Sequence, residues 1–395
     1  MAANPDTMKL VTGNQAAGHA LSIAGEANRD ARGVVSGIYP ITPQTEIVEY
    51  VANFPFSKGR VIPVESEHSA MGVCIGASLN GARTFTASSS NGLAYMAENV
   101  MVAAFYRLPV VMAAVNRTLG PPWNIWVDQG DTLMFRDFGW VQMYCDSNQD
   151  VADTTLLAFR LAEDPRILLP VMVCMDAFIV SHTAMETDLA TQEQADRFLP
   201  ACNIPHSQDP AHPVTVGGLA WPQETMSQRL DLDEAIRRVP SVLEEHRAEF
   251  KTLFGREVDG AVTGYYTEDA EDILIASGTV AMTALEVVRG LRGEGRKIGM
   301  VRIKMFRPFP TDEIRALCAS AKRIGVLDRN YAAGIGGIFC HDVRACLQAQ
   351  GGALVQGYLT GVGGGDVVPS MVREAVDDLG KRERAGLPVW MGVEK

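Results

Sequence analysis

Two kinds of hydrophobic spacing alternate along the first half of the chain. Residues 109–115 form an almost wholly apolar run, which is typical of a central parallel strand covered on both faces. Elsewhere apolar residues recur at helical spacing, as at Ile47, Val48 and Val51. Strand-like and helix-like segments follow each other in this way through the first half. The pattern predicts a doubly wound α/β domain over residues 1–192.

The alternation then stops and later resumes. Residues 193–262 contain scattered prolines followed by an amphipathic pattern at 241–254, which predicts a linker with a docking helix. From residue 263 to 395, short apolar runs alternate again with helical patterns. Because 395 residues exceed one ordinary hydrophobic core, we expect a second, smaller α/β domain here.

Composition and charge exclude some classes of protein. Hydrophobic residues make up 47% and charged residues 21%, as in ordinary folded proteins. The formal net charge of -12 argues against a nucleic-acid partner and against an anionic membrane surface. The sequence has no apolar run long enough to span a membrane and no signal-peptide pattern at its start. We therefore expect a cytoplasmic protein with no membrane association.

The seven cysteines are scattered, and the nearest pair, Cys340 and Cys346, is six residues apart. Iron–sulfur and structural zinc sites normally show much closer cysteine spacing. We expect reduced, mostly buried thiols and no metal ligand on this chain.

Two short tracts are the strongest candidates for chemistry. Residues 38–45 place two prolines and the hydroxyl of Thr42 at the end of a predicted strand, where α/β folds bind ligands. Residues 64–72 place Glu67 at the start of a helix of small residues. A buried carboxylate that faces a ligand needs a protonated partner. The pair suggests a coenzyme site in which Glu67 shares a proton with a heterocycle, although Glu67 alone could simply favour the helix start.

A third candidate follows the apolar run. Arg117 stands where that strand should end, a position that suits recognition of a carboxylate, with a structural ion pair as the alternative. The loop at 120–131 carries Trp123 and Trp126, which suggests a surface for a substrate or a partner.

Two further motifs are weaker. The glycine-rich tract at 361–366 lacks the spacing of a phosphate-binding loop, so we expect a turn near a domain interface. Residues 328–330, Asp-Arg-Asn, follow a predicted strand and could be a strand-end cap. No histidine has a serine or cysteine partner that would indicate a catalytic triad.

Many of these tracts, in one order, resemble one family. The chain is similar to the α subunit of the multi-subunit 2-oxoacid:ferredoxin oxidoreductases, of which pyruvate synthase is the familiar member. The resemblance rests on residues 39–45, 62–70, 86–93, 106–112, 115–117, 160–163, 169–173, 305–310 and 326–329. It implies a pyrimidine-type thiamine diphosphate-binding domain followed by a transketolase C-terminal-like domain.

The resemblance also implies roles for individual residues. Glu67 matches the glutamate that hydrogen-bonds the aminopyrimidine of the coenzyme, and Pro40, Thr42, Ser90 and Asn91 fall in the same coenzyme-binding tracts. Thr42 and Arg117 match the residues that hold the 2-oxo acid, and with Glu67 they make up the expected catalytic set. The expected substrate pocket also contains Tyr39, Asn116, Trp123 and Trp126.

The remaining chemistry is expected on partner chains. A Gly-Asp-Gly with a downstream Asn, which would bind Mg²⁺ and the diphosphate, is absent from the sequence. The resemblance assigns this part to a β subunit, and [4Fe-4S] clusters to partner chains that include γ and ferredoxin-like δ subunits. The implied reaction converts a 2-oxo acid and coenzyme A into acyl-CoA and CO2, with electrons passed to ferredoxin or another acceptor.

The substrate is the least determined part. Pyruvate-type members commonly have His where this chain has Gln129, and a small or aliphatic residue where it has Trp123. We therefore expect a bulkier acid, branched-chain or aromatic such as phenylglyoxylate, unless the tryptophans face a partner subunit. The alternatives are a pyruvate:ferredoxin oxidoreductase proper, a subunit of a 2-oxo acid dehydrogenase-type thiamine enzyme, and a non-catalytic scaffold paralogue.

Overall fold

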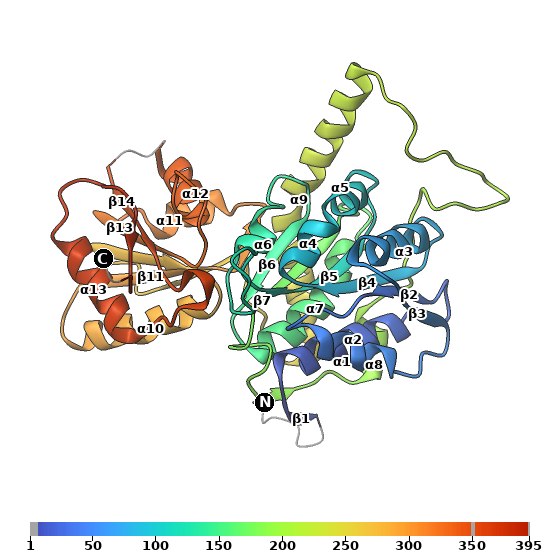
Figure 1. The fold of residues 1–395 in the computed structure, drawn as a ribbon, viewed down its shortest axis with the longest axis horizontal. Coiled ribbons are helices and arrows are strands. Elements are labelled where there is room, and N and C mark those ends of the chain that lie inside the picture. The colour runs from blue at the N-terminus through green and yellow to red at the C-terminus, as the bar shows by residue number, and fades with distance from the viewer. Residues whose placement is uncertain (1–6, 349–351, 394–395) are drawn as a thin grey trace.

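The computed structural model describes residues 7–348 and 352–393, which form two α/β domains side by side (Figure 1). The first domain is built on a seven-stranded sheet with the order β12-β6-β7-β5-β4-β2-β3. Its strands are β2 (Val34–Ile38), β3 (Gly59–Pro63), β4 (Arg83–Ser88), β5 (Val110–Asn116), β6 (Val141–Cys145), β7 (Val171–Asp176) and β12 (Met305–Arg307). All are parallel except β12, which pairs antiparallel with β6.

Helices cover both faces of this sheet, as the alternation of hydrophobic spacing predicted. On one face lie α1 (Gly13–Glu26), α2 (Thr45–Ala52), α7 (Asn148–Ala162) and α8 (Gln192–Phe198), and on the other α3 (Glu67–Leu79), α4 (Ser90–Tyr95), α5 (Ala97–Phe105) and α6 (Gly130–Leu133) (Figure 1). The apolar strand β5 is paired on both sides and is buried along its whole length. A short ribbon of β1 (Met8–Val11) and β8 (Met185–Asp188) lies beside the sheet.

The second domain has its own six-stranded sheet with the order β15-β14-β13-β10-β11-β9. Its strands are β9 (Val262–Tyr265), β10 (Asp272–Ala276), β11 (Ile298–Ile303), β13 (Arg323–Asp328), β14 (Leu354–Leu359) and β15 (Val389–Trp390). The helices are α10 (Gly278–Gly293), α11 (Thr311–Leu317), α12 (Ile338–Leu347) and α13 (Pro369–Gly380), with a 3-10 turn η2 at Val362–Gly364. Only β9 runs antiparallel within this sheet. The predicted boundaries at 192/193 and 262/263 stay a prediction.

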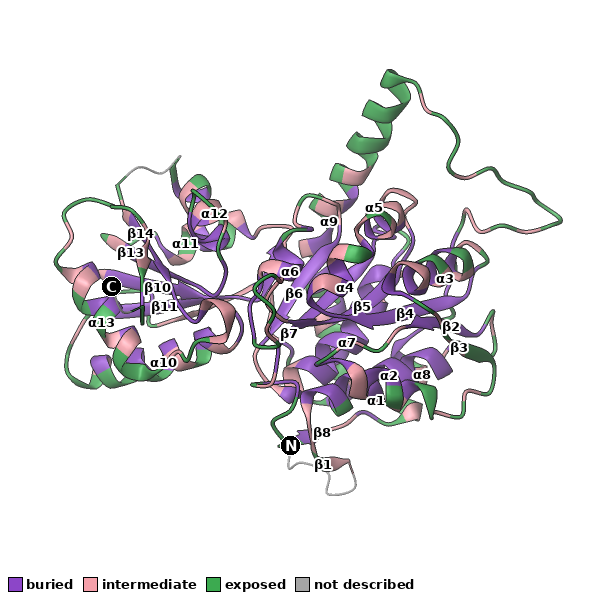
Figure 2. Cartoon of the chain, in the orientation of Figure 1, coloured by how far each residue is buried: buried purple, intermediate pink, exposed green. Residues whose placement is uncertain are grey.

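The docking helix is much longer than predicted. Helix α9 covers Pro222–Phe254, whereas the sequence pattern placed a helix only at 241–254. Pro240 lies inside the helix, and Pro222, which was read as an interruption, occupies its first turn, where proline is well tolerated. The second half of α9 is anchored in the first domain by buried side chains such as Phe250, while the first half projects and is exposed (Figures 1 and 2).

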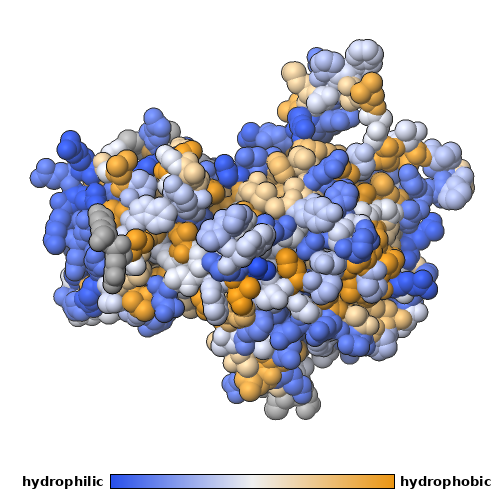
Figure 3. Space-filling view, viewed as in Figure 1, coloured by the Kyte–Doolittle hydropathy of each residue, from blue (hydrophilic) through white to orange (hydrophobic). Residues whose placement is uncertain are grey.

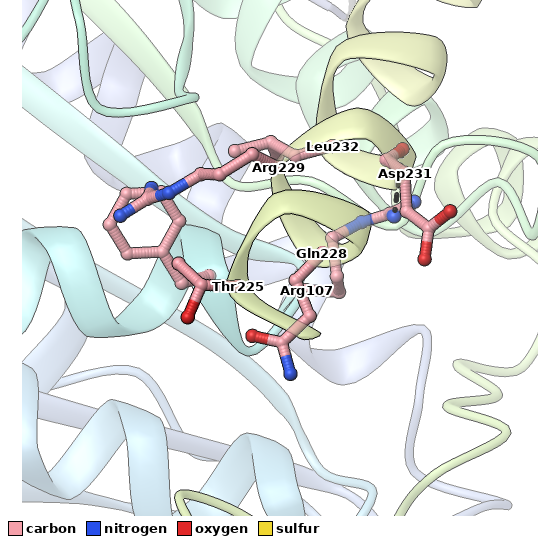
Figure 4. Close-up of a pocket in the computed structure, with 7 residues that line it drawn as sticks. Arg107, Thr225, Gln228, Arg229, Asp231 and Leu232 are labelled. Carbon is pink, nitrogen blue, oxygen red and sulfur yellow. Dashed lines mark hydrogen bonds between the residues drawn. The ribbon is translucent and has the colours of Figure 1, made fainter. Parts of the chain in front are cut away.

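The projecting half of α9 touches the body of the domain at one seam (Figure 4). There the guanidinium of Arg229 lies 3.6 Å from the ring centre of Phe105 at the end of α5. Arg107 donates to the carbonyl oxygen of Asp231 at 3.4 Å. Beyond this seam, the large apolar side chains of Met226 and Leu230 are exposed, and hydrophobic residues show at the tip of the projection in Figure 3.

The two domains are joined by a strand and by a buried ion cluster. After β11, the chain leaves the second sheet and adds β12 to the first. Beside this crossing, Arg302 is 3% exposed and contacts Asp146, Asp150 and Asp259 at 2.8, 2.6 and 2.6 Å. Burial alone would raise the pKa of Asp150, but Lys304 and Arg302 hold that pKa at about 2.

All seven cysteines are buried and unpaired. Within residues 7–348 and 352–393, no helix is both long and apolar enough to cross a membrane.

Candidate active site

The carboxyl ends of four neighbouring strands border one open pocket of about 690 Å³. The loops after β2, β3, β4 and β5 each contribute side chains to its wall. The lining residues are Tyr39, Pro40, Ile41, Thr42, Glu65, Ser66, Glu67, Asn91, Gly92, Tyr95, Arg117 and Ile125. The two sequence tracts that were singled out, and Arg117, therefore meet at the edge where α/β sheets bind ligands.

Glu67 is the first residue of α3 and is buried, with 6% of its surface exposed. The cap of the helix is Ser66, whose hydroxyl accepts a hydrogen bond from the Ser69 N–H at 3.2 Å. The Glu67 carboxylate accepts no hydrogen bond from another side chain in the described part of the chain. Burial raises the pKa of Glu67, and its own backbone N–H offsets this only in part. Glu67 is therefore a buried carboxylate that lacks a side-chain partner among the described residues, and the helix cap does not need it.

Gly92 is a site residue that the sequence reading missed. A Cβ atom at this position would lie 2.5 Å from Oε1 of Glu67 and 2.8 Å from Oγ of Ser88, which side chains do not tolerate. The hydroxyl of Ser88 is itself buried and has no hydrogen-bond partner in the described structure. Glycine thus lets the carboxylate of Glu67 and the hydroxyl of Ser88 lie directly against the backbone of α4. The signal available in the sequence was the glycine that ends the Ser-Ser-Ser-Asn-Gly tract.

Arg117 is held by backbone carbonyls. Its Nε donates to the carbonyl oxygen of Asn124 at 2.8 Å, and its Nη1 donates to that of Thr42 at 2.9 Å. Burial lowers the pKa of Arg117, and Asp131 opposes this effect. Among the described residues, Arg117 has no acidic side chain as an ion-pair partner, so the structural ion pair considered as the alternative is not seen there. Within the same described residues, no hydrogen bond is made by its remaining nitrogen, Nη2.

The loop that carries Thr42 is fixed at several points. The amide of Gln44 donates to the carbonyl oxygen of Tyr39 at 2.8 Å, and Asn14 donates to that of Pro43 at the same distance. The Thr42–Pro43 peptide is cis, and the Thr42 side chain is exposed to the pocket. Tyr39, Pro40 and Thr42 are therefore brought together with Glu67, as predicted from the sequence.

Asp131 organises the rear of the pocket and was not recognised from the sequence. Its carboxylate accepts hydrogen bonds from the N–H groups of Ser90 at 2.9 Å and Arg117 at 3.0 Å, and from the side chain of Asn116 at 2.8 Å. It is fully buried, and burial raises its pKa to about 7. Asn91 lines the pocket and exchanges two hydrogen bonds with Gly120, at 3.2 and 2.9 Å.

Four predicted contacts are not brought into the pocket. Ser90 and Asn116 lie behind it, because their polar groups are used by Asp131 and the adjoining loop. Trp123 and Trp126 are 70% and 51% exposed and point elsewhere. The loop turns so that Ile125, between them, faces the pocket instead.

Gln129 and Trp126 lie toward the second domain. The amide of Gln129 is 3.4 Å from Asp176, and its N–H donates to the carbonyl oxygen of Arg329 at 3.0 Å. The ring of Trp126 packs 4.9 Å from that of Phe178. Within residues 7–348 and 352–393, no cluster of three or more His, Cys, Asp or Glu side chains could hold a metal ion.

Comparison with known proteins agrees with this geometry. Residues 26–248 match the family profile described as pyruvate flavodoxin/ferredoxin oxidoreductase, thiamine diphosphate-binding. Residues 270–372 match that of pyruvate:ferredoxin oxidoreductase core domain II. A pyruvate synthase subunit PorA of Methanothermobacter thermautotrophicus is 40% identical, covering 98% of this chain and 99% of the relative. A ketoisovalerate oxidoreductase subunit VorA of Pyrococcus abyssi is also 40% identical, covering 96% and 95%.

Solved structures show the same fold at lower sequence identity. The 2-oxoglutarate:ferredoxin oxidoreductase from Magnetococcus marinus superposes with a TM-score of 0.71 at 19% identity, over 94% of this chain and 65% of that one. A split-gene transketolase superposes with a TM-score of 0.56 at 15% identity, over 94% and 98%. The chain belongs to the 2-oxoacid:ferredoxin oxidoreductase family, as an α-type subunit of these thiamine diphosphate-dependent enzymes, which act with partner subunits.

Proposed function

We propose that this chain supplies the pyrimidine-binding half of a thiamine diphosphate site and the anchor for the carboxylate of a 2-oxo acid. The observation that carries the proposal is the buried carboxylate of Glu67, which has no side-chain partner among the described residues and faces the same pocket as an arginine without an acidic partner there. The first group suits a protonated or proton-sharing heterocycle, and the second suits a carboxylate.

The residues present fit the coenzyme. Glu67 has a raised pKa and no side-chain partner, so a hydrogen bond to a basic ring nitrogen would satisfy it. Gly92 allows this carboxylate to lie close to the backbone at the pocket wall, and the unsatisfied hydroxyl of Ser88 lies beside Gly92. We propose that Glu67 holds the proton at that ring nitrogen and that Pro40 and Asn91 border the same space. When bound, thiamine diphosphate supplies the nucleophilic carbon and electron sink for decarboxylation.

Arg117 and Thr42 are proposed to bind and orient the 2-oxo acid. The backbone carbonyls of Thr42 and Asn124 fix the guanidinium of Arg117 before any substrate arrives. Such preorganisation aims Nη2 at an incoming carboxylate without a large entropic cost. The exposed hydroxyl of Thr42 and the side chain of Tyr39 border the same space. Asn116 and Ser90 support this arrangement through Asp131 rather than by touching the substrate.

The other functions are proposed for partner chains. The relatives are named as subunits, which supports an enzyme of several chains. We propose a β subunit that binds the diphosphate and Mg²⁺ across the open pocket, and γ and ferredoxin-like δ subunits that complete the enzyme, with [4Fe-4S] clusters on these partner chains. Coenzyme A would accept the acyl group, and ferredoxin or another carrier would take the electrons.

The proposed substrate is a branched-chain 2-oxo acid, with pyruvate as the second candidate. Relatives named for pyruvate and for ketoisovalerate are both 40% identical to this chain, so identity does not separate the two. Trp123 and Trp126, which suggested an aromatic acid such as phenylglyoxylate, lie outside the pocket. The aliphatic side chain of Ile125 and the ring of Tyr95 line it instead and suit an aliphatic substrate.

Kinetics of the assembled complex test this assignment. We expect kcat/KM to be higher for 3-methyl-2-oxobutanoate than for pyruvate or phenylglyoxylate. Ile125→Ala should change the ratio between the acids by about tenfold, the usual effect of a few methylene groups in a pocket. Trp123→Ala is the matched control and should leave the ratio unchanged. A wild-type preference for pyruvate, or a ratio that responds to Trp123 rather than Ile125, would contradict the proposal.

A further inference from the structure

A glycine-rich turn of the second domain lies against a loop that borders the proposed active site. The turn covers residues 361–365, includes η2 and follows β14; it is called the glycine turn below. The loop covers residues 124–129 of the first domain and carries Ile125, which lines the pocket of Glu67 and Arg117; it is called the bridging loop below. The second domain is therefore connected to the side of the pocket where the 2-oxo acid is proposed to bind.

Several contacts join the glycine turn to the bridging loop. The side-chain amide of Asn124 donates to the carbonyl oxygen of Gly363 at 3.2 Å. The N–H of Gly363 donates to Oδ2 of Asp128 at 3.1 Å, so this glycine is bonded to the loop through both of its backbone groups. Gly364 has a positive φ of 93°, and a Cβ atom there would lie 2.0 Å from the Cβ of Trp126. Glycine thus allows a close backbone approach that no side chain tolerates.

The far end of the bridging loop is also held by the second domain. The backbone N–H of Gln129 donates to the carbonyl oxygen of Arg329 at 3.0 Å, which gives the Asp-Arg-Asn motif after β13 a structural role. Gly278, the first residue of α10, has a positive φ of 57°. A Cβ atom there would lie 2.9 Å from the side-chain nitrogen of Gln129. Both ends of the loop are therefore fixed by contacts across the domain boundary.

Asn124 connects these contacts to the proposed substrate anchor. Its backbone carbonyl accepts the hydrogen bond from Nε of Arg117 at 2.8 Å. Its side-chain oxygen accepts from the N–H of Trp126 at 3.0 Å, a local bond that fixes the bend of the loop. Its side-chain nitrogen is the group that reaches Gly363. The amide is bonded to the loop at one end and to the second domain at the other, which sets the direction of the carbonyl that holds Arg117.

We propose that Asn124 is a positioning residue for the 2-oxo acid and that the glycine turn of the second domain keeps it in place. This inference rests on the proposed role of Arg117 as the carboxylate anchor. Asn124 is not among the residues that line the pocket, so it acts on the substrate only through Arg117. A guanidinium that is fixed in advance loses less entropy on binding. Release of Arg117 should therefore weaken substrate binding and leave the chemical step largely unchanged.

Asn124→Ala in the assembled complex tests the positioning role. Loss of the side-chain hydrogen bonds should raise KM for the 2-oxo acid about five- to tenfold and change kcat by less than about twofold. Calorimetric titration gives a second measurement that needs no turnover. Its probe is oxamate, which keeps the carboxylate and adjacent carbonyl of a 2-oxo acid, and its Kd should rise by a similar factor. Asn80→Ala is the control, because Asn80 is exposed and also donates to a backbone carbonyl, that of Gly76. It should leave KM and Kd unchanged.

Gly364→Ala tests the contribution of the second domain. Its methyl group would meet the side chain of Trp126 and displace the bridging loop, so KM and the Kd of oxamate should rise as in Asn124→Ala. Gly334→Ala is the matched control within the second domain. Gly334 has a similar φ of 78°, but an added Cβ atom has no neighbour within 4 Å. This variant carries comparable backbone strain and should bind oxamate like the wild type.

Arg117→Lys separates this inference from the proposed function, because lysine lacks the Nε that Asn124 holds. Alone, it should raise KM at least about tenfold, and in its background Asn124→Ala should change KM by less than about twofold. A wild-type KM in Arg117→Lys would contradict the anchor and this inference together. A raised KM in Arg117→Lys would leave the anchor standing. In that case, an unchanged KM in Asn124→Ala or Gly364→Ala, a loss of kcat alone, or additive effects in the double variant would overturn this inference only.

Discussion

Glu67 and Arg117 line the same pocket and carry opposite charges. Glu67 needs a hydrogen-bond donor, and Arg117 needs an anion. Burial raises the pKa of the Glu67 carboxyl and lowers that of the Arg117 guanidinium, so both groups are destabilised in their charged forms. Neither uses the other as a partner. A ligand that brings a ring nitrogen to Glu67 and a carboxylate to Arg117 satisfies both at once. This complementarity is the physical basis of the proposed function.

Asp131 is expected to position Arg117. Its oxygens accept from backbone N–H groups on one side and from Asn116 on the other, so an amide at this place would turn an NH2 group toward a donor. In Asp131→Asn, we expect KM for the 2-oxo acid to rise about 10- to 100-fold, as expected for roughly 1.5–3 kcal/mol of disrupted hydrogen bonding.

Steady-state kinetics check this prediction. Asp137→Asn, at a side chain that is 69% exposed, is the control and should change nothing. If Asp131 acts through Arg117, Asp131→Asn should cost little in an Arg117→Gln background. Additive effects of the two substitutions would show that Asp131 supports the fold generally.

The pH dependence of stability provides a second test of Asp131. Its pKa is raised from 3.8 to about 7 in the folded chain, so folding favours the protonated form. The stabilisation relative to an untitratable side chain is therefore complete below about pH 4 and is lost as the pH rises toward 7. The difference in free energy of unfolding between wild type and Asp131→Asn should fall across this range. Urea unfolding at several pH values measures it, and a constant difference would contradict the raised pKa.

At the scale of elements, hydrophobic spacing predicted the strands and helices whose positions depend on the local sequence pattern. The strands of both sheets and the helices around them follow the alternation of spacing, because each element buries one face or both. The sequence reading began the docking helix only at residue 241 and took Pro222 as an interruption, yet burial of Val239, Val242 and Leu243 carries α9 through Pro240. Tertiary packing overrides a local propensity in this case.

The two halves of α9 should differ sharply in their contribution to stability. Phe250 is fully buried against Phe198 and Phe254, with ring centres 5.4 and 4.0 Å away. Phe250→Ala should lower the free energy of unfolding by about 3–5 kcal/mol, because it leaves a cavity. Met226→Ala, at a side chain that is 68% exposed on the same helix, should change it by less than about 0.5 kcal/mol. Denaturant titration of the two variants measures both changes. Similar losses of unfolding free energy would refute the division of α9 into an anchored and a projecting half.

At the scale of the whole molecule, the important contacts join residues far apart in the sequence. Met305–Arg307 belongs to the second domain by sequence but extends the sheet of the first, which no local pattern shows. Likewise, Glu67, Thr42 and Arg117 could be selected from the sequence because each ends a strand or starts a helix. Gly92, Asp131 and Ile125 could not, because their importance depends on side chains that only the folded chain brings near them.

The ion cluster at the domain junction should contribute strongly to stability. Arg302→Met leaves the buried carboxylate of Asp146 without its main partner and that of Asp150 with Lys304 alone, which should cost about 3–5 kcal/mol in the free energy of unfolding. The control is Arg373→Met, which breaks an exposed pair with Glu294 and should cost less than about 1 kcal/mol. Thermal and urea unfolding compare the two. Equal effects would mean that the junction is held mainly by β12 and apolar packing.

Glu67→Gln in the assembled complex determines whether the Glu67 carboxylate shares a proton with the coenzyme. The substitution keeps the shape of the side chain and removes its charge, so the complex should still assemble while kcat falls by about 10³-fold. The KM for the 2-oxo acid, which depends on Arg117, should change by less than about threefold. Glu98→Gln, at a side chain that is 80% exposed, should retain wild-type activity. A Glu67→Gln complex with kcat close to that of the wild type would mean that Glu67 shares no proton with the coenzyme during the reaction, and would favour a non-catalytic role for this chain.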